Sequence, residues 1–235
     1  SIIIPYHRKK KYFSSTINSI SLQTFKNYEV ILIYDDIRIN ELGFVKNTLK
    51  KIRNKKILKN KKILGPGLSR NKGIVNSSGQ YLAFCDADDI WNKNKLKIQL
   101  NFMKKNKLSF SHSNYYIINY KNKKVGKFII KKIIDFNDLM KSCDIGLSSV
   151  MLHRKLISKK RIFCNLKTKE DYFLWLKIIK EIKFIRGINK FLVSWRYSKG
   201  SLSDSLLQKI NDAFRLYNRH EKYSKIISFL FVIRL

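Results

Sequence analysis

Three aspartates follow a short apolar run near the middle of the chain. The run is Tyr81-Leu-Ala-Phe-Cys85, and Asp86, Asp88 and Asp89 come directly after it. Carboxylates are costly to remove from water without a positive partner, so a cluster of three at the end of a buried strand predicts a bound cation, usually a divalent one. Asp86 and Asp88 leave the strand at alternate positions and can reach a metal and a sugar hydroxyl together. Carboxylate oxygens suit Mg²⁺ or Mn²⁺, which often complete their shell with substrate phosphates.

Two more groups of polar residues follow predicted strands. Pro5-Tyr6-His7-Arg8 comes after the strand Ile2-Ile-Ile4, and Asp35-Asp36 ends the strand that begins at Tyr28. Short β-branched runs alternate with helical patterns over the first half, which predicts an α/β fold with a Rossmann-like, mostly parallel sheet flanked by helices. Ligands of such sheets bind at the carboxyl ends of the strands, so we expect the three groups to converge on one site.

The remaining patterns predict further elements and a division of the chain. Periodicity predicts helices over residues 12–25, 68–76, 96–103 and 171–182. It predicts strands at 57–58 or 63–64, at 108–112 and at 191–197. Residues 115–120 and 125–130 predict a small antiparallel hairpin, and a helical stripe from Asp204 through Leu206, Ile210, Phe214 and Tyr217 predicts a C-terminal helical tail. We therefore expect a nucleotide-binding half over 1–112, an acceptor-binding and catalytic-base half of the same domain over 113–200, and the tail over 201–235.

The composition is strongly basic. The 235 residues include 50 Lys and Arg against 16 Asp and Glu, a formal net charge of +34. Scattered lysines without a nucleic-acid-binding module favour a solvated surface over a nucleic-acid partner, with peripheral contact to an anionic membrane as the alternative. Three cysteines without CxxC spacing favour neither a disulfide framework nor a zinc site, and indicate a reducing cytoplasm. The apolar run Ile226–Ile233 is too short to span a membrane, so residues 223–235 are either a last buried helix or a segment lying on a membrane.

Five short motifs occur in order along the chain. They are Ser1-Ile-Ile-Ile-Pro5, Ser19 to Glu29 leading into Val30 to Asp36, Ser69-Arg-Asn-Lys-Gly73, Ser78 to Trp91, and Lys169-Glu-Asp-Tyr-Phe-Leu-Trp175. In this order and spacing the chain resembles family-2 glycosyltransferases of the GT-A fold over roughly residues 1 to 200. The resemblance implies inverting transfer from a nucleoside-diphosphate sugar, most often a UDP-sugar, with Mn²⁺ or Mg²⁺ as cofactor. It also implies a glycan or lipid-linked acceptor in bacterial surface-polysaccharide assembly, at the inner face of the cell membrane.

The resemblance assigns the donor side of the site. Pro5 and Tyr6 would line the nucleotide pocket, and Asp36 together with Asp35 would hydrogen-bond the base. Arg70 would lie beside the base and the diphosphate. These are expectations carried over from the family, residue by residue.

The resemblance also assigns the metal and the catalytic base. Asp86, Ala87 and Asp88 would contact the donor, with Asp88 as the direct metal ligand and Asp86 helping to hold the metal or the sugar. Asp171, in the Glu170-Asp171 pair, would take the proton of the acceptor hydroxyl, as transfer to that hydroxyl requires.

Other interpretations remain open from the sequence. Asp89 can be purely structural, and Glu170-Asp171 can simply suit the amino end of a helix. A sugar-1-phosphate nucleotidyltransferase would also use a metal and carboxylates, but it needs a glycine-rich loop after the first strand, which Pro5 to Lys10 lacks. The non-enzymatic alternative is a basic nucleic-acid-binding protein, for which steeply salt-dependent binding would be the signature. The segment Ser194-Trp-Arg-Tyr197 only partly matches the QxxRW motif of processive synthases, which favours transfer of a single sugar; Trp195 with Arg196 could face the acceptor.

Overall fold

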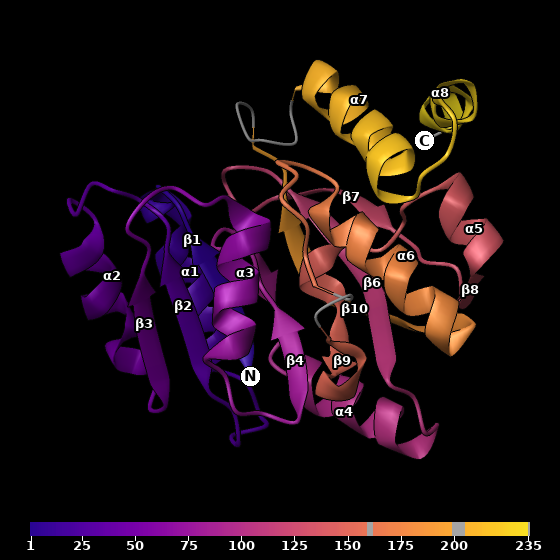
Figure 1. The fold of residues 1–235 in the computed structure, drawn as a ribbon. Helices are drawn as coiled ribbons and strands as arrows, with labels where there is room; N and C mark the ends of the chain where they lie inside the picture. The colour runs from indigo at the N-terminus through magenta and orange to yellow at the C-terminus, as the bar shows by residue number, and fades with distance from the viewer. Residues whose placement is uncertain (159–161, 199–204, 235) are drawn as a thin grey trace.

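One mixed ten-stranded sheet runs through the molecule, in the order β3-β2-β1-β4-β9-β6-β10-β5, with β7 on β6 and β8 on β10 (Figure 1). The structure is a computed structural model and describes residues 1–158, 162–198 and 205–234. The strands are β1 Ile2–Tyr6, β2 Val30–Tyr34, β3 Lys55–Lys59, β4 Tyr81–Phe84, β5 Ile90–Trp91, β6 Phe110–Ile118, β7 Lys124–Phe128, β8 Ile133–Asp135, β9 Met151–His153 and β10 Phe184–Arg196.

Helices cover both faces of this sheet. They are α1 Lys10–Ser21, α2 Leu42–Thr48, α3 Pro66–Val75, α4 Lys95–Lys105, α5 Phe136–Lys141, α6 Glu170–Ile182, α7 Leu206–Arg215 and α8 Lys225–Arg234. Alternate residues of the central strands point to opposite faces, as the pleat requires. Ile3 packs in the core with α3, α5 and α6, whereas Ile2 and Ile4 pack in the core with α1, α2 and α4.

The first half of the sheet is parallel and the second half is mixed. β1 pairs in parallel with both β2 and β4, and β2 pairs in parallel with β3. β9 is antiparallel to both β4 and β6, and the hairpin of β6 and β7 is antiparallel as predicted. The predicted α/β class is therefore confirmed, and the strand predicted at 57–58 or 63–64 is the one over Lys55–Lys59.

Several predicted boundaries differ from the structure for identifiable reasons. The strands expected at 108–112 and 115–120 are one strand, because the polar break at Ser113-Asn114 is satisfied within the sheet: Asn114 donates to Asn189 Oδ1 at 2.8 Å and accepts from Ile130 N at 3.0 Å. The helix α1 ends at Ser21 rather than near residue 25, since the buried amide of Gln23 bonds to the chain around Asn92 instead.

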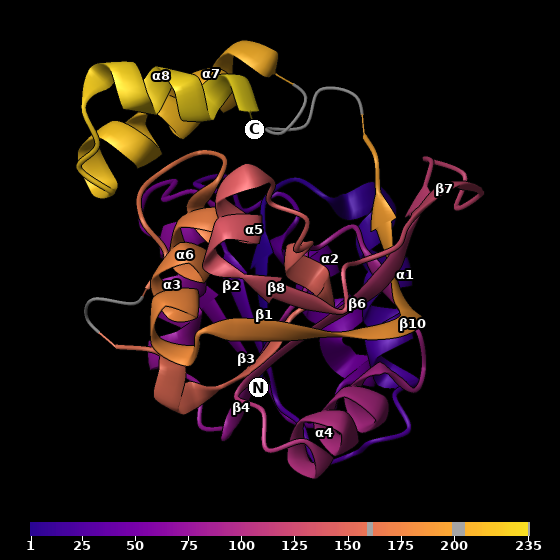
Figure 2. The same cartoon turned by 90° about the vertical axis from the view of Figure 1, so that its right-hand side faces the viewer.

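The C-terminal tail is helical, as predicted, and lies at one end of the molecule. α7 is followed by a π-helical turn over Leu216–His220 and then by α8. In Figures 1 and 2 α7 and α8 lie at the top, and the amino terminus, where β1 starts, lies towards the bottom. Asp204, at which we expected the tail helix to start, lies outside the described residues.

Candidate active site

The predicted aspartates Asp35, Asp36, Asp86 and Asp88 follow strands that end at the same edge of the sheet, whereas Pro5 and Tyr6, expected after the first strand, are the last residues of β1 itself. Tyr6, the last residue of β1, lies opposite Tyr34 of β2, and β4 runs parallel to β1 on its other side. The segments after these strands carry Asp35-Asp36 and the loop 86–89, which here is called the acidic loop. Parallel strands that end together bring their following loops together, so the topology itself assembles the site.

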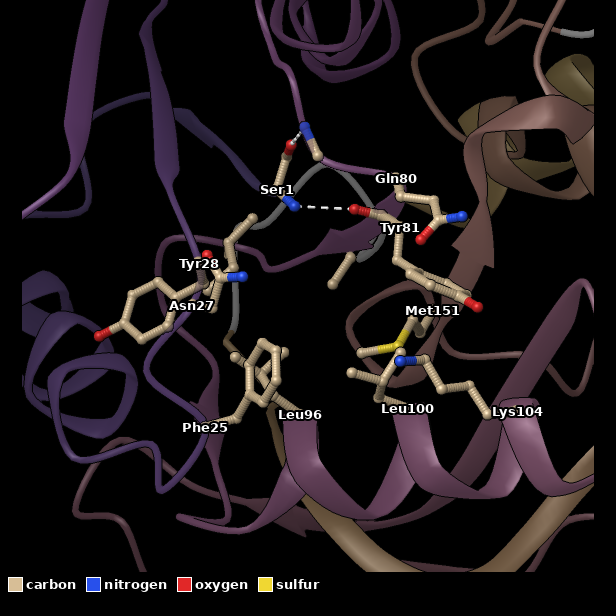
Figure 3. Close-up of a pocket in the computed structure, with 13 residues that line it drawn as sticks. Ser1, Phe25, Asn27, Tyr28, Gln80, Tyr81, Leu96, Leu100, Lys104 and Met151 are labelled. Carbon is tan, nitrogen blue, oxygen red and sulfur yellow. Dashed lines mark hydrogen bonds between the residues drawn. The ribbon is translucent and has the colours of Figure 1, made fainter.

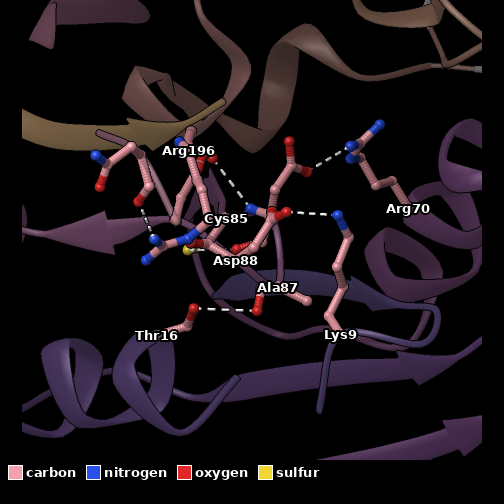
Figure 4. A network of polar contacts seen from close by, with 11 residues as sticks. Lys9, Thr16, Arg70, Cys85, Ala87, Asp88 and Arg196 are labelled. Carbon is pink, nitrogen blue, oxygen red and sulfur yellow. Dashed lines mark hydrogen bonds and ion pairs between the residues drawn. The ribbon is translucent and has the colours of Figure 1, made fainter. Parts of the chain in front are cut away.

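The acidic loop is held from three sides (Figure 4). The hydroxyl of Thr16, in α1, donates to the carbonyl of Ala87 at 3.1 Å, and the amide of Asp86 donates to Ser148 Oγ at 3.0 Å. Asp89 is 1% exposed and accepts from the backbone N–H of Arg196 at 2.8 Å. Asp89 therefore has a structural role here, which was one of the interpretations left open from the sequence. The side chain of Asp86 is 34% exposed, and that of Asp88 is 12% exposed.

Arg70 connects the acidic loop to the start of α6. Its Nη2 donates to Asp86 Oδ1 at 2.7 Å and its Nη1 donates to Glu170 Oε1 at 2.6 Å. The side chain of Arg70 is only 3% exposed and lies against the ring of Phe163. A guanidinium offers its donors in a rigid fork. Arg70 therefore fixes the relative positions of two carboxylates that are far apart in the sequence.

The carboxylate of Asp88 already has a cation beside it. Lys9, the residue before α1, places Nζ 2.5 Å from Asp88 Oδ2 (Figure 4). Burial and the negative charge of Asp86 raise the pKa of Asp88, whereas Lys9 acts against this rise. The position thus attracts positive charge, as the sequence indicated.

The first turn of α6 carries the predicted base. Asp171 accepts from the backbone N–H of Tyr172 at 2.7 Å. Burial raises the pKa of Asp171, Arg70 opposes this, and the charge of Asp86 adds to the rise. Burial and the neighbouring Asp171 also raise the pKa of Glu170, to about 7. A raised carboxylate pKa is the usual property of a side chain that must take up a proton near neutral pH.

Asp35 and Asp36 take different places at the end of β2. Asp35 accepts from the backbone N–H groups of Leu64 and Gly65, both at 2.8 Å, and so holds the segment that leads into α3. Asp36 accepts from the N–H of Arg38 at 3.0 Å and from Arg8 Nε at 2.7 Å, and the Arg8 guanidinium lowers its pKa. Asp36 closes its own turn, and the contact of either aspartate with a base stays a prediction.

Pro5 and Tyr6 differ in exposure, although the resemblance implies that both line the nucleotide pocket. Pro5 is partly exposed, whereas the ring of Tyr6 is fully buried between Phe13 and Tyr34. The hydroxyl of Tyr6 donates to Glu41 Oε2 at 2.5 Å. The structure therefore places the ring of Tyr6 in the core and outside the polar cluster.

The residues present fit a hard divalent cation. Asp88 and Asp86 would hold it through carboxylate oxygens, the ligands that Mg²⁺ and Mn²⁺ prefer. Within the described part of the chain, no group of three or more His, Cys, Asp or Glu side chains is placed to hold a metal. A cation held by Asp88 and Asp86 would complete its shell with water, or with the oxygens of a bound diphosphate.

Comparison with known proteins decides the family. The Glycosyl transferase family 2 model matches residues 1–161. The chain belongs to that family. A relative from Escherichia coli, the UDP-Glc:alpha-D-GlcNAc-diphosphoundecaprenol beta-1,3-glucosyltransferase WfgD, is 37% identical over 217 residues, which are 89% of this chain and 81% of WfgD. The family predicted from the five motifs is confirmed, and the protein is a glycosyltransferase.

Solved structures confirm the fold of this glycosyltransferase. S. aureus TarS 1-349 in complex with UDP-GlcNAc matches with a TM-score of 0.74 at 17% identity, over 98% of this chain and 69% of TarS 1-349. The mannosyltransferase PcManGT from Pyrobaculum calidifontis, in complex with GDP-Man and Mn²⁺, matches with a TM-score of 0.70 at 10% identity, over 99% of this chain and 68% of PcManGT. Among the residues that the structure describes, no helix is long and apolar enough to cross a membrane.

Two cations of the glycosyltransferase site were not predicted from the sequence. Lys9 stands in the run Arg8-Lys-Lys-Lys11, and in so basic a chain nothing distinguishes it from its neighbours. From the sequence, Arg196 could face the acceptor, but it is 3% exposed and its Nε donates to the carbonyl of Asp88 at 2.8 Å. The sequence signal for Arg196 was its position at the end of a predicted strand, because the three other polar groups of the site also follow or end predicted strands.

One cavity of the glycosyltransferase lies away from these residues. It has a volume of about 230 Å³ and is lined by the amino ends of β1 and β4, together with Tyr28, Leu96 and Lys104 (Figure 3). Ligands of parallel α/β sheets bind at the opposite ends of the strands. We therefore take the acidic loop, and not this cavity, as the candidate active site.

Proposed function

We propose that this glycosyltransferase moves one sugar from a uridine-diphosphate sugar to a hydroxyl of a lipid-linked glycan, with inversion, during the assembly of a bacterial surface polysaccharide. The observation that carries the proposal is the ion-pair chain from Asp86 through Arg70 to Glu170, which joins the acidic loop to the residue beside the predicted base, Asp171. The name of WfgD specifies a UDP-sugar donor and a diphosphoundecaprenol-linked acceptor, and TarS is known in complex with UDP-GlcNAc.

The proposed division of labour follows the two halves of the chain. Residues 1–112 would hold the donor, and 113–200 would supply the acceptor surface and the base. Asp171 would accept the proton of the acceptor hydroxyl while that oxygen bonds to the anomeric carbon and the bond to the diphosphate breaks. Its raised pKa suits this task, because the protonated base is then less acidic than an ordinary aspartic acid.

Dependence on a divalent metal is part of the proposal. Asp88 and Asp86 would hold Mn²⁺ or Mg²⁺, which would neutralise the charge that develops on the leaving diphosphate. PcManGT, with the same fold, is known in complex with Mn²⁺. Work on a lipid-linked acceptor would bring the protein to the inner face of the cell membrane.

The test is a donor screen followed by two conservative variants. UDP-, GDP- and dTDP-sugars are incubated with MnCl₂ and a lipid-diphosphate-linked N-acetylglucosamine, and release of nucleoside diphosphate is measured. We expect a UDP-sugar to be consumed, and Asp88→Asn and Asp171→Asn each to lower kcat by on the order of 100-fold or more. Asp138→Asn, at the exposed capping box of α5, is the matched control and should retain full activity.

Either of two results would contradict the proposal. Full activity of both site variants would remove the assignment of base and metal ligand. Release of pyrophosphate from a nucleoside triphosphate, with no consumption of nucleotide sugars, would identify a nucleotidyltransferase instead.

A further inference from the structure

The outward face of α8 is apolar. Ile226, Phe229, Leu230 and Ile233 are 76%, 59%, 56% and 68% exposed, and they follow one another at helical spacing. Residues spaced by three and four lie on the same side of a helix, so these four form a single row, called here the outer stripe. The opposite side of the helix carries Ser228, which is fully buried.

The inner side of α8 is anchored to the protein. Phe231 packs with its ring centroid 5.0 Å from that of Tyr217 and 5.1 Å from that of Tyr223, and Val232 also packs against the main core. The orientation of α8 is therefore fixed by buried contacts, and the outer stripe is turned away from the core by the same contacts. A contiguous apolar row that is held outward in this way is typical of a surface that meets another apolar phase.

The exposed charges of the segment 205–234 have one sign. Lys225 and Arg234 begin and end α8, and both are exposed. Three more exposed cations stand between α7 and α8 or at their ends, namely Arg215, Arg219 and Lys222.

The two acids of the segment 205–234 are turned inward. Asp212 is fully buried and accepts from the backbone N–H of Thr168 at 2.8 Å. The side chain of Glu221 is 2% exposed and is paired with Lys177 and Lys180 of α6. The surface of this segment therefore shows cations and apolar side chains together, which complements the anionic headgroups and acyl chains of a bilayer.

The position of α8 suits the acceptor side of the site. α7 and α8 lie at the end of the molecule opposite the amino terminus in both views (Figures 1 and 2). β1 starts at that terminus and runs away from it, so its carboxyl end, with Lys9 and the acidic loop beside it, points to the same end of the molecule as α8. A membrane under α8 would thus lie at the end of the molecule that carries the acidic loop.

We infer that the outer stripe of α8 docks the protein on an anionic membrane surface, with the flanking cations on the lipid headgroups. The inference deepens the proposed function, on which it rests for the lipid-linked nature of the acceptor. The apolar stripe and the cations contribute separately. Salt should weaken the contact between the cations and the headgroups and should leave the contact between the outer stripe and the acyl chains unchanged.

The experiment compares two matched double variants on vesicles. Phe229→Ser with Ile233→Ser removes half of the outer stripe, and Val75→Ser with Ile129→Ser removes two apolar side chains that are 82% and 60% exposed elsewhere. Co-sedimentation is measured with phosphatidylglycerol–phosphatidylcholine vesicles and with phosphatidylcholine alone, at low and high salt. We expect the stripe variant to bind the anionic vesicles about tenfold more weakly than the unmodified protein, with the control pair within about twofold of it.

A second measurement reports insertion directly. In Phe229→Trp the added indole should be quenched by brominated lipids when anionic vesicles are present, relative to the unmodified protein with its three tryptophans. Equal vesicle binding by the stripe variant and the unmodified protein would overturn the inference, and so would a dimer that the stripe substitutions dissociate, because a second copy would then cover the stripe.

Turnover on a water-soluble acceptor separates this inference from the proposed function. The stripe variant should transfer sugar to a short-chain acceptor as fast as the unmodified protein does. Stripe-dependent vesicle binding by a protein that turns over no nucleotide sugar would leave the inference standing and refute the proposed function.

Discussion

Arg70 donates to Glu170 at 2.6 Å, although one hundred positions separate the two residues in the chain. The second arm of the same guanidinium holds Asp86, so the acidic loop and the first turn of α6 share one buried cation. Removal of one partner from a buried, charge-paired hydrogen bond leaves the other partner uncompensated. Glu170 therefore acts as a positioning residue for the acidic loop as well as a neighbour of the predicted base.

This ion pair predicts the acid side of the pH profile. Burial and Asp171 raise the pKa of Glu170 to about 7, and the pKa of Asp171 is raised as well. A carboxyl with a raised pKa takes up its proton at a higher pH than usual, so the ionised pair with Arg70 and the free base are both lost as the pH falls. We expect kcat to decline as the pH falls through about 7, with protonation of Asp171 adding to the loss.

Glu170→Gln separates the two titrations. The amide cannot titrate, so the variant should lose the decline that Glu170 causes near pH 7 and keep the part that protonation of Asp171 causes, with kcat reduced by about tenfold at alkaline pH. Steady-state rates across the pH range, with Glu181→Gln as the control on the far end of α6, measure this. A limb near pH 7 that persists in Glu170→Gln would show that another group produces it.

Lys9 predicts an effect on metal affinity that does not depend on turnover. Its Nζ lies 2.5 Å from Asp88 Oδ2, the oxygen that a cation would use. A metal must compete with this ammonium before it reaches the carboxylate, so Lys9→Met should tighten Mn²⁺ binding by about tenfold in the absence of nucleotide. Isothermal titration of Mn²⁺ into the protein measures the affinity directly.

The neighbouring lysine is the matched control for this experiment. Lys10 stands next in the chain, with its Nζ over the ring of Phe44 at 5.6 Å, and Lys10→Met should leave Mn²⁺ affinity unchanged. Asp88→Asn should abolish the binding in both backgrounds. Weaker Mn²⁺ binding in Lys9→Met would mean that Lys9 supports the cation instead of competing with it.

Arg196 predicts a loss of both stability and metal affinity. Its Nε donates to the carbonyl of Asp88 at 2.8 Å, and its Nη1 and Nη2 donate to Asn119 and Asn122 at 2.7 and 2.6 Å. The guanidinium thus ties the acidic loop to the turn between β6 and β7. A lysine carries its three N–H donors on one nitrogen and cannot replace three separate nitrogens of the guanidinium, so Arg196→Lys should lower the free energy of unfolding by about 2 kcal/mol and weaken Mn²⁺ binding severalfold.

Arg186→Lys, in the same strand, serves as the control and should change neither quantity. Urea unfolding gives the free energies, and the titration described for Lys9 gives the affinities. If Arg196→Lys lost stability but bound Mn²⁺ as before, the residue would support the fold alone and not the position of Asp88.

The parallel half of the fold was predictable because its strands are apolar runs that end abruptly in polar residues. β1, β2 and β4 all show this pattern, and the topology then brings Asp36, Asp86 and Asp88 to one edge. The short strands β5, β8 and β9 have only two or three residues and are paired with distant segments, so no local period reveals them.

The partners of the site carboxylates were not predictable for a different reason. The chain holds 50 Lys and Arg, and any of them could in principle pair with an aspartate. Only the folded chain shows that Lys9 meets Asp88, that Arg70 spans to Glu170, and that Arg196 folds back onto the acidic loop. Long-range pairing of this kind depends on the tertiary structure and leaves no trace in spacing.

Lys95 makes the last prediction, because among the described residues no carboxylate forms an ion pair with this buried amine. It is fully buried at the start of α4, its Nζ donates to Gln99 Oε1 at 2.6 Å, and the amine lies 4.3 Å from the centre of the Trp91 ring. Burial lowers the pKa of Lys95 from 10.5 to about 7. The unfolded chain keeps its proton up to about pH 10.5, so the native state carries the full cost of the buried charge below pH 7 and loses that cost as the pH rises towards 10.5.

Replacement of Lys95 by methionine should therefore stabilise the protein in a pH-dependent way. Lys95→Met should raise the free energy of unfolding by roughly 2 kcal/mol at neutral pH, since the apolar side chain fills the same space without the desolvation cost of an ammonium. The gain should shrink as the pH approaches 10.5, where the native protein no longer holds a charge at this position. Lys97 lies two residues further along the same helix and is exposed, so Lys97→Met should change stability little at any pH. Urea unfolding across this pH range compares the three proteins, and a Lys95→Met variant that is less stable at every pH would show that the bond to Gln99 outweighs the cost of the buried charge.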